Sequence, residues 1–123
     1  MKLRFSFFLS KEKDMRDFCK INGIIYQAYS ALGSGDRPWR HEGSIMSGAP
    51  YGGHEVLTHP DLVRMASKHD VSVAQVVLRW HLQMGRAAVA KSSHPERVKQ
   101  NYKLWHFALD ADDMEARLFF RAF

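Results

Sequence analysis

The chain has 123 residues and a formal net charge of +5, with 46% hydrophobic and 25% charged residues. That length suits one domain with a modest core, and the composition is ordinary for a globular protein. A single cysteine, Cys19, excludes an internal disulfide framework, and no apolar run approaches the length that spans a bilayer. The first residues resemble a signal peptide only weakly, because the apolar run from Phe5 to Leu9 is short. We therefore expect a cytoplasmic protein that does not interact with membranes.

The first expected elements are a helix over residues 12–20 and a strand over residues 23–30. The apolar positions on one face of the helix are Met15, Phe18 and Cys19. Gly23 is placed to end the helix. The strand "GIIYQAYS" combines β-branched and aromatic residues and ends in small polar ones, which is typical of a strand that meets a loop.

A long glycine-rich loop follows, and no periodic pattern predicts an element within it. Loops of this length inside a compact domain are usually lids, binding loops or disordered segments. We predict a flexible loop over residues 36–58, within a single domain that covers residues 1–123.

Two helices are expected next, over residues 60–69 and 73–84. Pro60 is a favourable first helical residue, Ser72 is a good N-cap for the second helix, and Gly85 is placed to end it. The expected buried positions are Leu62, Val63, Met65 and Ala66 in the first helix and Val73, Val76, Val77 and Trp80 in the second.

The remaining elements are a short strand, "RAAVAK", a helix that Pro95 opens, and a last helix over residues 109–120 with Asp110 as its cap. Strands that alternate with helices predict βαβ units with a parallel sheet. Two strands are too few for such a sheet, which needs several strands and cover on both faces. The pattern therefore resembles part of a larger α/β architecture.

Polar groups follow both expected strands. Ser30 and Ser34 come after the first, and Lys91 and Ser92 come after the second, just before the N-terminus of the helix that Pro95 opens. The carboxyl ends of parallel strands and the N-termini of helices both favour anionic ligands. Residues 86–103 also hold five Lys or Arg residues and a single acidic one, which adds a positive local field.

The same region offers groups for a flat polar ring. Arg97 can hold a phosphate with two hydrogen bonds, Gln100 and Asn101 can reach polar atoms of a purine, and Tyr29 offers an aromatic face. Each residue alone also fits an ordinary solvated or core position, so the ligand hypothesis depends on their combination. Nucleic acid is not expected as a partner, because the chain has no nucleic-acid motif and no basic stripe interleaved with aromatic residues.

Three segments carry a resemblance to a known family: "FCKINGIIYQAYSALGSGDRPW", "LTHPDLVRMASKHDVSVAQVVLRWHLQMGRAAVAKSSHPERVKQN" and "FALDADDM". Together they resemble the C-terminal part of an aldo-keto reductase, over about Phe18 to Met114. The resemblance implies a partial (β/α)8 TIM barrel, roughly its last three β/α units plus the C-terminal helices. It also implies an oxidoreductase that reduces a small aldehyde or ketone with NADPH.

The resemblance assigns residues in this chain to the cofactor NADP(H), in four groups. They are Tyr29 at the nicotinamide; Ser30, Leu32 and Ser34 at the pyrophosphate; Lys91, Ser92 and Arg97 at the adenosine 2′-phosphate; and Gln100 and Asn101 at the adenine. The family more often has Glu where this chain has Gln100. Its catalytic tyrosine, lysine, aspartate and histidine lie in the half of the barrel that this chain does not resemble, so no catalytic residue is transferred.

The resemblance therefore predicts a cofactor-binding part that is inactive alone. Two alternatives stay open: a non-catalytic fragment that binds NADP or self-associates through exposed barrel edges, and an incomplete gene product. The seven histidines show no HxxxH pair and no cysteine partner at ligand spacing, so no metal site is expected and solvated or capping roles are favoured. Trp80 and Trp105 are expected in the core.

Overall fold

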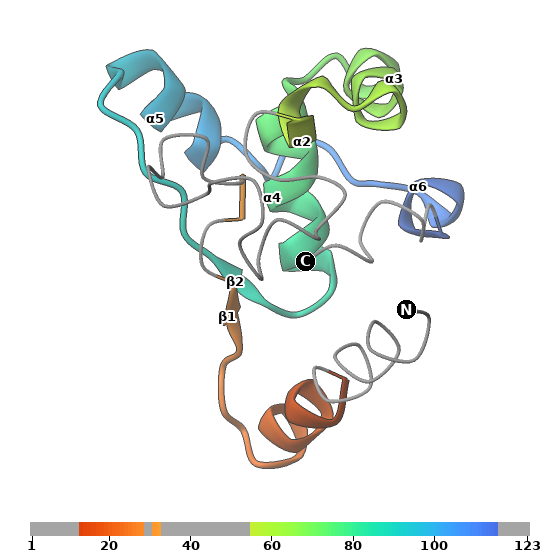
Figure 1. Ribbon diagram of the computed structural model, residues 1–123, viewed down its shortest axis with the longest axis vertical. Coiled ribbons are helices and arrows are strands. Elements are labelled where there is room, and N and C mark those ends of the chain that lie inside the picture. The colour runs from red at the N-terminus through yellow and green to blue at the C-terminus, as the bar shows by residue number, and fades with distance from the viewer. Residues whose placement is uncertain (1–12, 29–30, 33–54, 116–123) are drawn as a thin grey trace, which may run out of the picture.

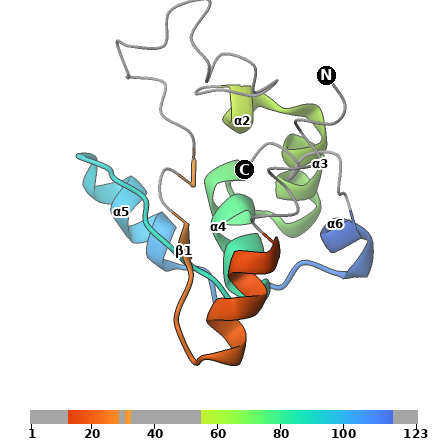
Figure 2. The same cartoon turned by 60° about the horizontal axis from the view of Figure 1, so that its bottom comes forward.

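The computed structural model describes residues 13–28, 31–32 and 55–115 (Figure 1). Residues 13–21 are helical, and the elements that follow are β1 (Gln27–Ala28), α2 (Glu55–Thr58), α3 (Pro60–His69), α4 (Val73–Gln83), β2 (Ala87–Ala88), α5 (Pro95–Tyr102) and α6 (Ala111–Glu115). The helix α4 lies at the centre, with α5 and α6 on opposite sides of it (Figures 1 and 2).

The helices α3 and α4 begin where their capping residues predict. Pro60 is the first residue of α3, and the side chain of His59 accepts a hydrogen bond from the Asp61 N–H group at 3.2 Å. At α4, Ser72 and Gln75 form a reciprocal capping box, with hydrogen bonds of 2.9 and 3.2 Å between side chain and backbone. Both helix starts confirm the sequence prediction.

Gly23 and Gly85 end their helices as expected. Each has a positive φ, 66° and 72°, which is the left-handed conformation that glycine adopts without steric cost. After α4, the Arg86 N–H group donates to the His81 carbonyl at 3.0 Å, which closes the last turn. The chain then leads directly into β2.

The two strands pair in parallel, as the alternation of strands and helices predicts. Gln27 lies opposite Ala87 and Ala28 opposite Ala88, with flanking hydrogen bonds of 3.0 and 3.2 Å from Ala87 to Tyr26 and from Val89 to Ala28. Among the described residues, two of each strand are paired, fewer than the sequence pattern predicts. The carboxyl ends of β1 and β2 therefore lie side by side.

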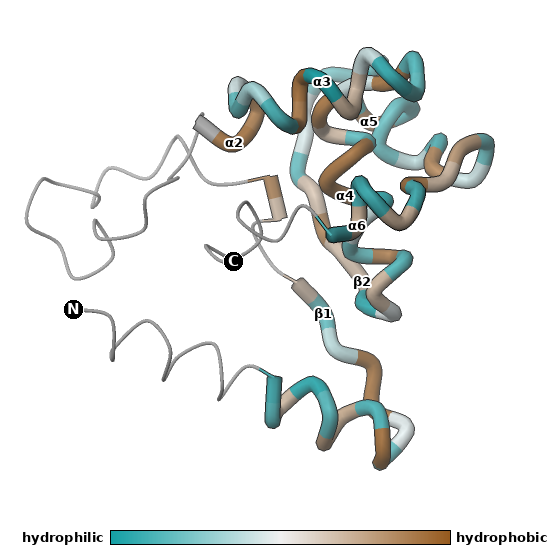
Figure 3. Tube along the Cα trace, turned by 90° about the vertical axis from the view of Figure 1, so that its right-hand side faces the viewer, coloured by the Kyte–Doolittle hydropathy of each residue, from teal (hydrophilic) through white to brown (hydrophobic). Residues whose placement is uncertain are grey.

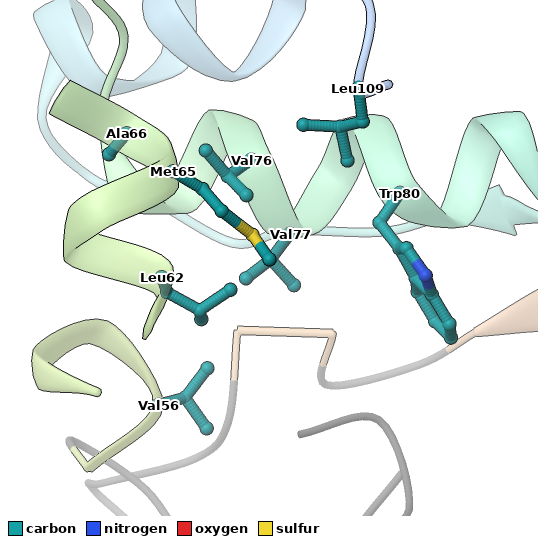
Figure 4. Packing of buried hydrophobic residues seen from close by; sticks show 8 residues of the cluster. All are labelled: Val56, Leu62, Met65, Ala66, Val76, Val77, Trp80 and Leu109. Atoms are coloured by element: carbon teal, nitrogen blue, oxygen red, sulfur yellow. The ribbon is translucent and has the colours of Figure 1, made fainter. Parts of the chain in front are cut away.

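The main core joins α2, α3 and α4 (Figure 4). Its buried members are Val56, Leu62, Met65, Ala66, Val76, Val77, Trp80 and Leu109. A smaller cluster of Ala31, Leu78 and Leu104 lies on the other side of α4, towards β2. The predicted stripe on α4 is thus confirmed at Val76, Val77 and Trp80, whereas Val63 on α3 is exposed.

The helix α2 is a correction to the prediction that residues 36–58 hold no element. Its four residues form one turn, and Val56 is fully buried against α3 and α4 (Figure 4). One turn is too short to show a helical period in the sequence, so only its tertiary contacts reveal it. The rest of the predicted flexible loop lies outside the described residues.

Residues 13–28 form the N-terminal arm. Its helix, residues 13–21, lies on the side of β1 away from α2 and α3 (Figures 1 and 3). Cys19 is buried as predicted, but Met15 and Phe18 on the same predicted face are more than half exposed. The exposed apolar residues continue through Ile21, Ile24 and Ile25. The arm therefore has an apolar face for which the described residues provide little cover.

Two differences concern the C-terminal part. Trp105, expected in the core, is 71% exposed, and the Arg79 guanidinium lies over its ring, 5.4 Å from the ring centre. Asp110 caps α6 as predicted, and its side chain accepts from the Asp113 N–H group at 3.0 Å. The predicted continuation of this helix to residue 120 lies outside the described residues. Within the described ranges, no helix is long and apolar enough to cross a membrane.

Candidate functional site

The predicted site residues divide between described and undescribed parts of the chain. Tyr29, Ser30 and Ser34 lie outside the described residues. Leu32 is half-buried, and its side chain packs against both core clusters. The side chain of Leu32 therefore serves the core, and only its backbone is left for a ligand at the end of β1.

The remaining predicted residues lie in the clamp segment, defined as residues 91–101, which follows β2 and includes most of α5. Lys91 is exposed, and the Ser92 hydroxyl accepts a hydrogen bond from the His94 N–H group at 3.1 Å. This turn leads the chain from the carboxyl end of β2 to the N-terminus of α5. The hydroxyl proton of Ser92 stays available to donate to a ligand.

The N-terminus of α5 differs from that of α3 and α4 because its N-cap side chain makes no capping hydrogen bond. His94 occupies the N-cap position with extended backbone angles, and Pro95 follows as the first helical residue. The first turn of a helix presents N–H groups without intrahelical partners and carries a partial positive charge. Its geometry therefore suits an anion.

Two of the three Lys and Arg residues of the clamp segment have no anionic partner in the described part of the chain. Among the described residues, Lys91 and Arg97 make no hydrogen bond or ion pair with another side chain. Lys99, by contrast, is paired with Glu96 at 3.0 Å across one turn of α5. Because the Glu96 carboxylate is paired with Lys99, it repels an anion at the N-terminus of α5 less strongly.

An open cavity of about 350 Å³ lies between α4, β2 and α5. Its lining is mainly apolar, with Asn101 as its amide group; the lining residues are Leu78, Leu82, Ala88, Val89, Ala90, Val98, Asn101, Tyr102 and Leu104. Asn101 is half-buried and Gln100 is exposed beside it on α5. This surface combines an apolar wall with polar groups, as sites for flat heterocycles do.

A second polar cluster connects α3 to α6. His69 Nε2 lies 2.6 Å from an Asp113 carboxylate oxygen, and the Lys68 ammonium contacts both Asp110 and Asp113. The Lys68 hydrogen bond, with help from the Asp113 N–H group, lowers the pKa of Asp110 to about 2. The His69, Asp110 and Asp113 ligand atoms lie within 4.8 Å of one another, but the Lys68 ammonium already donates hydrogen bonds to both carboxylates. We therefore assign this cluster a structural role, in which it joins α3 to α6.

His81 was not singled out by the sequence, since its histidines were expected to be solvated or capping. It is 2% exposed, and in the described part of the chain neither ring nitrogen has a hydrogen-bond partner. The Trp80 ring packs edge-on at 4.9 Å, and burial lowers the pKa of His81 to about 4. Its position one turn after Val77, on the buried stripe of α4, is the signal that identifies it as a core residue.

Comparison with known proteins places these features in a family. The model of the Aldo/keto reductase family matches residues 1–117, a longer range than the segments quoted above. The chain is 36% identical to NADPH-dependent codeinone reductase 1-4 of Papaver somniferum, over 85% of its length and 29% of that protein. It is 34% identical to glycerol 2-dehydrogenase (NADP(+)) of Saccharomyces cerevisiae, over 88% of its length and 28% of that protein. It thus spans less than a third of these relatives.

The fold agrees with a solved structure. An aldo-keto reductase from a Medee basin deep-sea metagenome library superimposes with a TM-score of 0.64 and 30% identity, over 84% of this chain and 32% of that one. The similarity covers the order of elements as well as the sequence.

Proposed function

This chain belongs to the aldo/keto reductase family, and from that premise we propose that it binds NADP(H) through the clamp segment. Lys91, Ser92 and Arg97 would hold the adenosine 2′-phosphate, and Gln100 and Asn101 the adenine. Tyr29, Ser30, Leu32 and Ser34 would line the nicotinamide and pyrophosphate. The names of the two relatives described above, which specify NADPH and NADP⁺, support this choice of nucleotide.

The observation that carries the proposal is the N-terminus of α5, for which the described residues provide no side-chain cap. Its N-cap side chain makes no capping bond, and Lys91 and Arg97 near it have no anionic partner among the described residues. A phosphate would supply acceptors for the N–H groups and a counter-charge for both cations. NAD lacks that phosphate, so the same groups would favour NADP over NAD.

We place the chain in the last three β/α units of a (β/α)8 barrel. When bound, NADPH supplies the hydride that reduces a carbonyl carbon in such enzymes. The residues of this chain would bind and orient the cofactor, and none is assigned as a proton donor. We therefore expect no carbonyl-dependent oxidation of NADPH by the 123-residue chain alone. Cytoplasmic location and use of a small carbonyl substrate stay predictions.

Titration of NADP⁺ into the purified chain, followed by tryptophan fluorescence, tests the proposal. We expect saturable binding that prefers NADP⁺ to NAD⁺ and weakens about tenfold or more in Arg97→Ala, since a charge-assisted contact is lost. Lys103→Ala is the matched control, because it removes the same charge from the far end of α5, where the side chain is exposed, and leaves the Lys99–Glu96 pair in place. Equal affinity for both nucleotides, or equal losses in the two variants, would contradict the proposal.

A second candidate function, self-association, follows from the exposed apolar face of the N-terminal arm. Met15, Phe18, Ile21, Ile24 and Ile25 are each more than half exposed, and within the described ranges no third strand covers an edge of the sheet of β1 and β2. Sedimentation of the chain over a tenfold range of concentration tests it. A concentration-independent monomer would exclude this function.

A further inference from the structure

Three side chains of α4 hold the segment after α5 by its backbone. Gln75, Arg79 and Gln83 are spaced four residues apart and so lie on one face of α4. They contact residues 103–109, which we call the strap. The Gln75 amide donates to the Lys103 carbonyl at 2.9 Å, and Arg79 donates to the Leu104 carbonyl at 3.1 Å.

The contact of Gln83 with the strap consists of two hydrogen bonds. Gln83 donates to the Leu109 carbonyl at 3.0 Å and accepts from the Leu109 N–H group at 2.8 Å. The side-chain oxygen Oε1 of Gln83 also accepts a hydrogen bond from Arg79 Nε at 3.0 Å, so the contacts that Arg79 and Gln83 make with the strap support each other. Leu109 is buried in the main core and Leu104 in the smaller cluster, so the strap packs against both.

The strap matters because, in the described part of the chain, little else holds α5 in place. None of its residues is buried, and its N-terminus has no side-chain cap. Lys103, which Gln75 grips, is the C-cap residue of α5. Arg97 lies six residues earlier, about 9 Å along the helix axis. A small tilt about this anchor would therefore displace Arg97 and Gln100 relative to the end of β2.

We propose that Gln75, with Arg79 and Gln83, positions α5 and so sets the place of the clamp segment beside β2. Gln75 is the most informative member, because one amide performs two tasks. Its oxygen accepts from the Ser72 N–H group within the α4 capping box, and its nitrogen holds α5. It is a positioning residue that acts through the backbone of Lys103. This role in nucleotide binding rests on the function proposed above.

The substitution Gln75→Glu separates the two tasks. Glutamate keeps the acceptor that the capping box needs but loses the donor and opposes the Lys103 carbonyl. Ser72→Ala is the matched control, since it removes the cap and leaves the bond from Gln75 to Lys103. Gln83→Glu is a second test at the other end of the strap, in case the first variant fails to fold.

Hydrogen exchange of the ligand-free chain gives the first readout. We expect Gln75→Glu to speed exchange of the α5 amides about fivefold relative to those of α3, the equivalent of one net hydrogen bond. Ser72→Ala should leave that ratio unchanged. Unchanged α5 exchange in both glutamate variants would overturn the proposal, whether or not the chain binds nucleotide.

The preference for NADP⁺ over NAD⁺ gives the second readout. Loss of folded protein lowers both affinities by the same factor, whereas a displaced α5 weakens the phosphate contact that only NADP⁺ makes. We expect the preference to fall about fivefold in Gln75→Glu and to persist in Ser72→Ala. A preference that stays constant despite faster α5 exchange would overturn the link to the clamp. Failure of the parent chain to bind NADP⁺ would refute the function instead.

Discussion

The helices α4 and α5 differ in burial, in capping and in how many of their polar groups have partners. α4 buries six side chains, has a capping box at its start and ends at a glycine with positive φ. α5 buries none, lacks a side-chain cap and keeps Arg97 without a partner among the described residues. Polar groups that have hydrogen-bond partners within the protein stabilise its fold, whereas polar groups without such partners are available to a ligand. We infer that α4 stabilises the core of the domain, whereas α5 is a surface helix that carries ligand-binding groups.

The largest expected effect is on the α4 side of this comparison. Leu62→Ala removes a fully buried side chain from the core between α3 and α4 and should lower the free energy of unfolding by about 2–5 kcal/mol. Val98→Ala on α5 should cost less than about 1 kcal/mol, because Val98 is half exposed. Urea denaturation measures both values. Similar losses would mean that α5 belongs to the core.

Acid should act on α4 through His81. Its pKa is lowered from 6.5 to about 4 by burial, so the unfolded chain binds a proton that the folded chain resists. The resulting stability is complete above pH 6.5 and is lost as the pH falls towards 4, by roughly 3 kcal/mol. Urea denaturation across this range should show the loss, and His81→Leu should remove it. Asp110, whose pKa is lowered from 3.8 to about 2 in the fold, stabilises the fold above pH 3.8 and loses this contribution only as the pH falls towards 2.

Removal of the α4 cap should produce a smaller change. Ser72→Ala should lower the free energy of unfolding by about 1 kcal/mol, since the Gln75 N–H group loses its acceptor. Thermal unfolding with circular dichroism measures the shift. An undiminished melting temperature would show that the cap is replaced by solvent and that α4 depends on packing alone.

The smallest effect tests whether α5 stays uncapped in favour of a ligand. His94→Asp should add a cap and stabilise the chain by about 0.5–1 kcal/mol, while weakening NADP⁺ binding because a carboxylate then meets the N–H groups. His94→Asn adds the cap without the charge and separates the two causes. Stabilisation with undiminished NADP⁺ affinity would place the phosphate elsewhere.

The sequence predicts the parts of the fold that depend on local chemistry. Pro60, Ser72, Gly23 and Gly85 mark helix ends through backbone preferences that act within a few residues, and each position is confirmed. The parallel pairing of β1 with β2 follows from the alternation of elements. The helix ends need no knowledge of distant contacts, and the strand pairing needs only the order of elements along the chain.

The features that the sequence misses depend on tertiary contacts. α2 is helical because Val56 reaches the core, and Phe18 is exposed because nothing described covers it, although its helical spacing predicts burial. The strap is invisible for the same reason, since its partners are main-chain groups that any residue carries. For the site, sequence resemblance selects Arg97, Gln100 and Asn101, but only the structure shows that the α5 N-terminus lacks a cap.

The strap also bears on how freely this part of the chain can change over generations. The side chains of α4 bind the strap through its backbone carbonyls and one backbone N–H group. Most substitutions at the exposed positions Trp105, His106 and Ala108 therefore leave these hydrogen bonds in place. Proline at 109 is the exception, since it would remove the N–H group that Gln83 accepts. Saturation mutagenesis should find a tolerant stretch of sequence between two fixed helices.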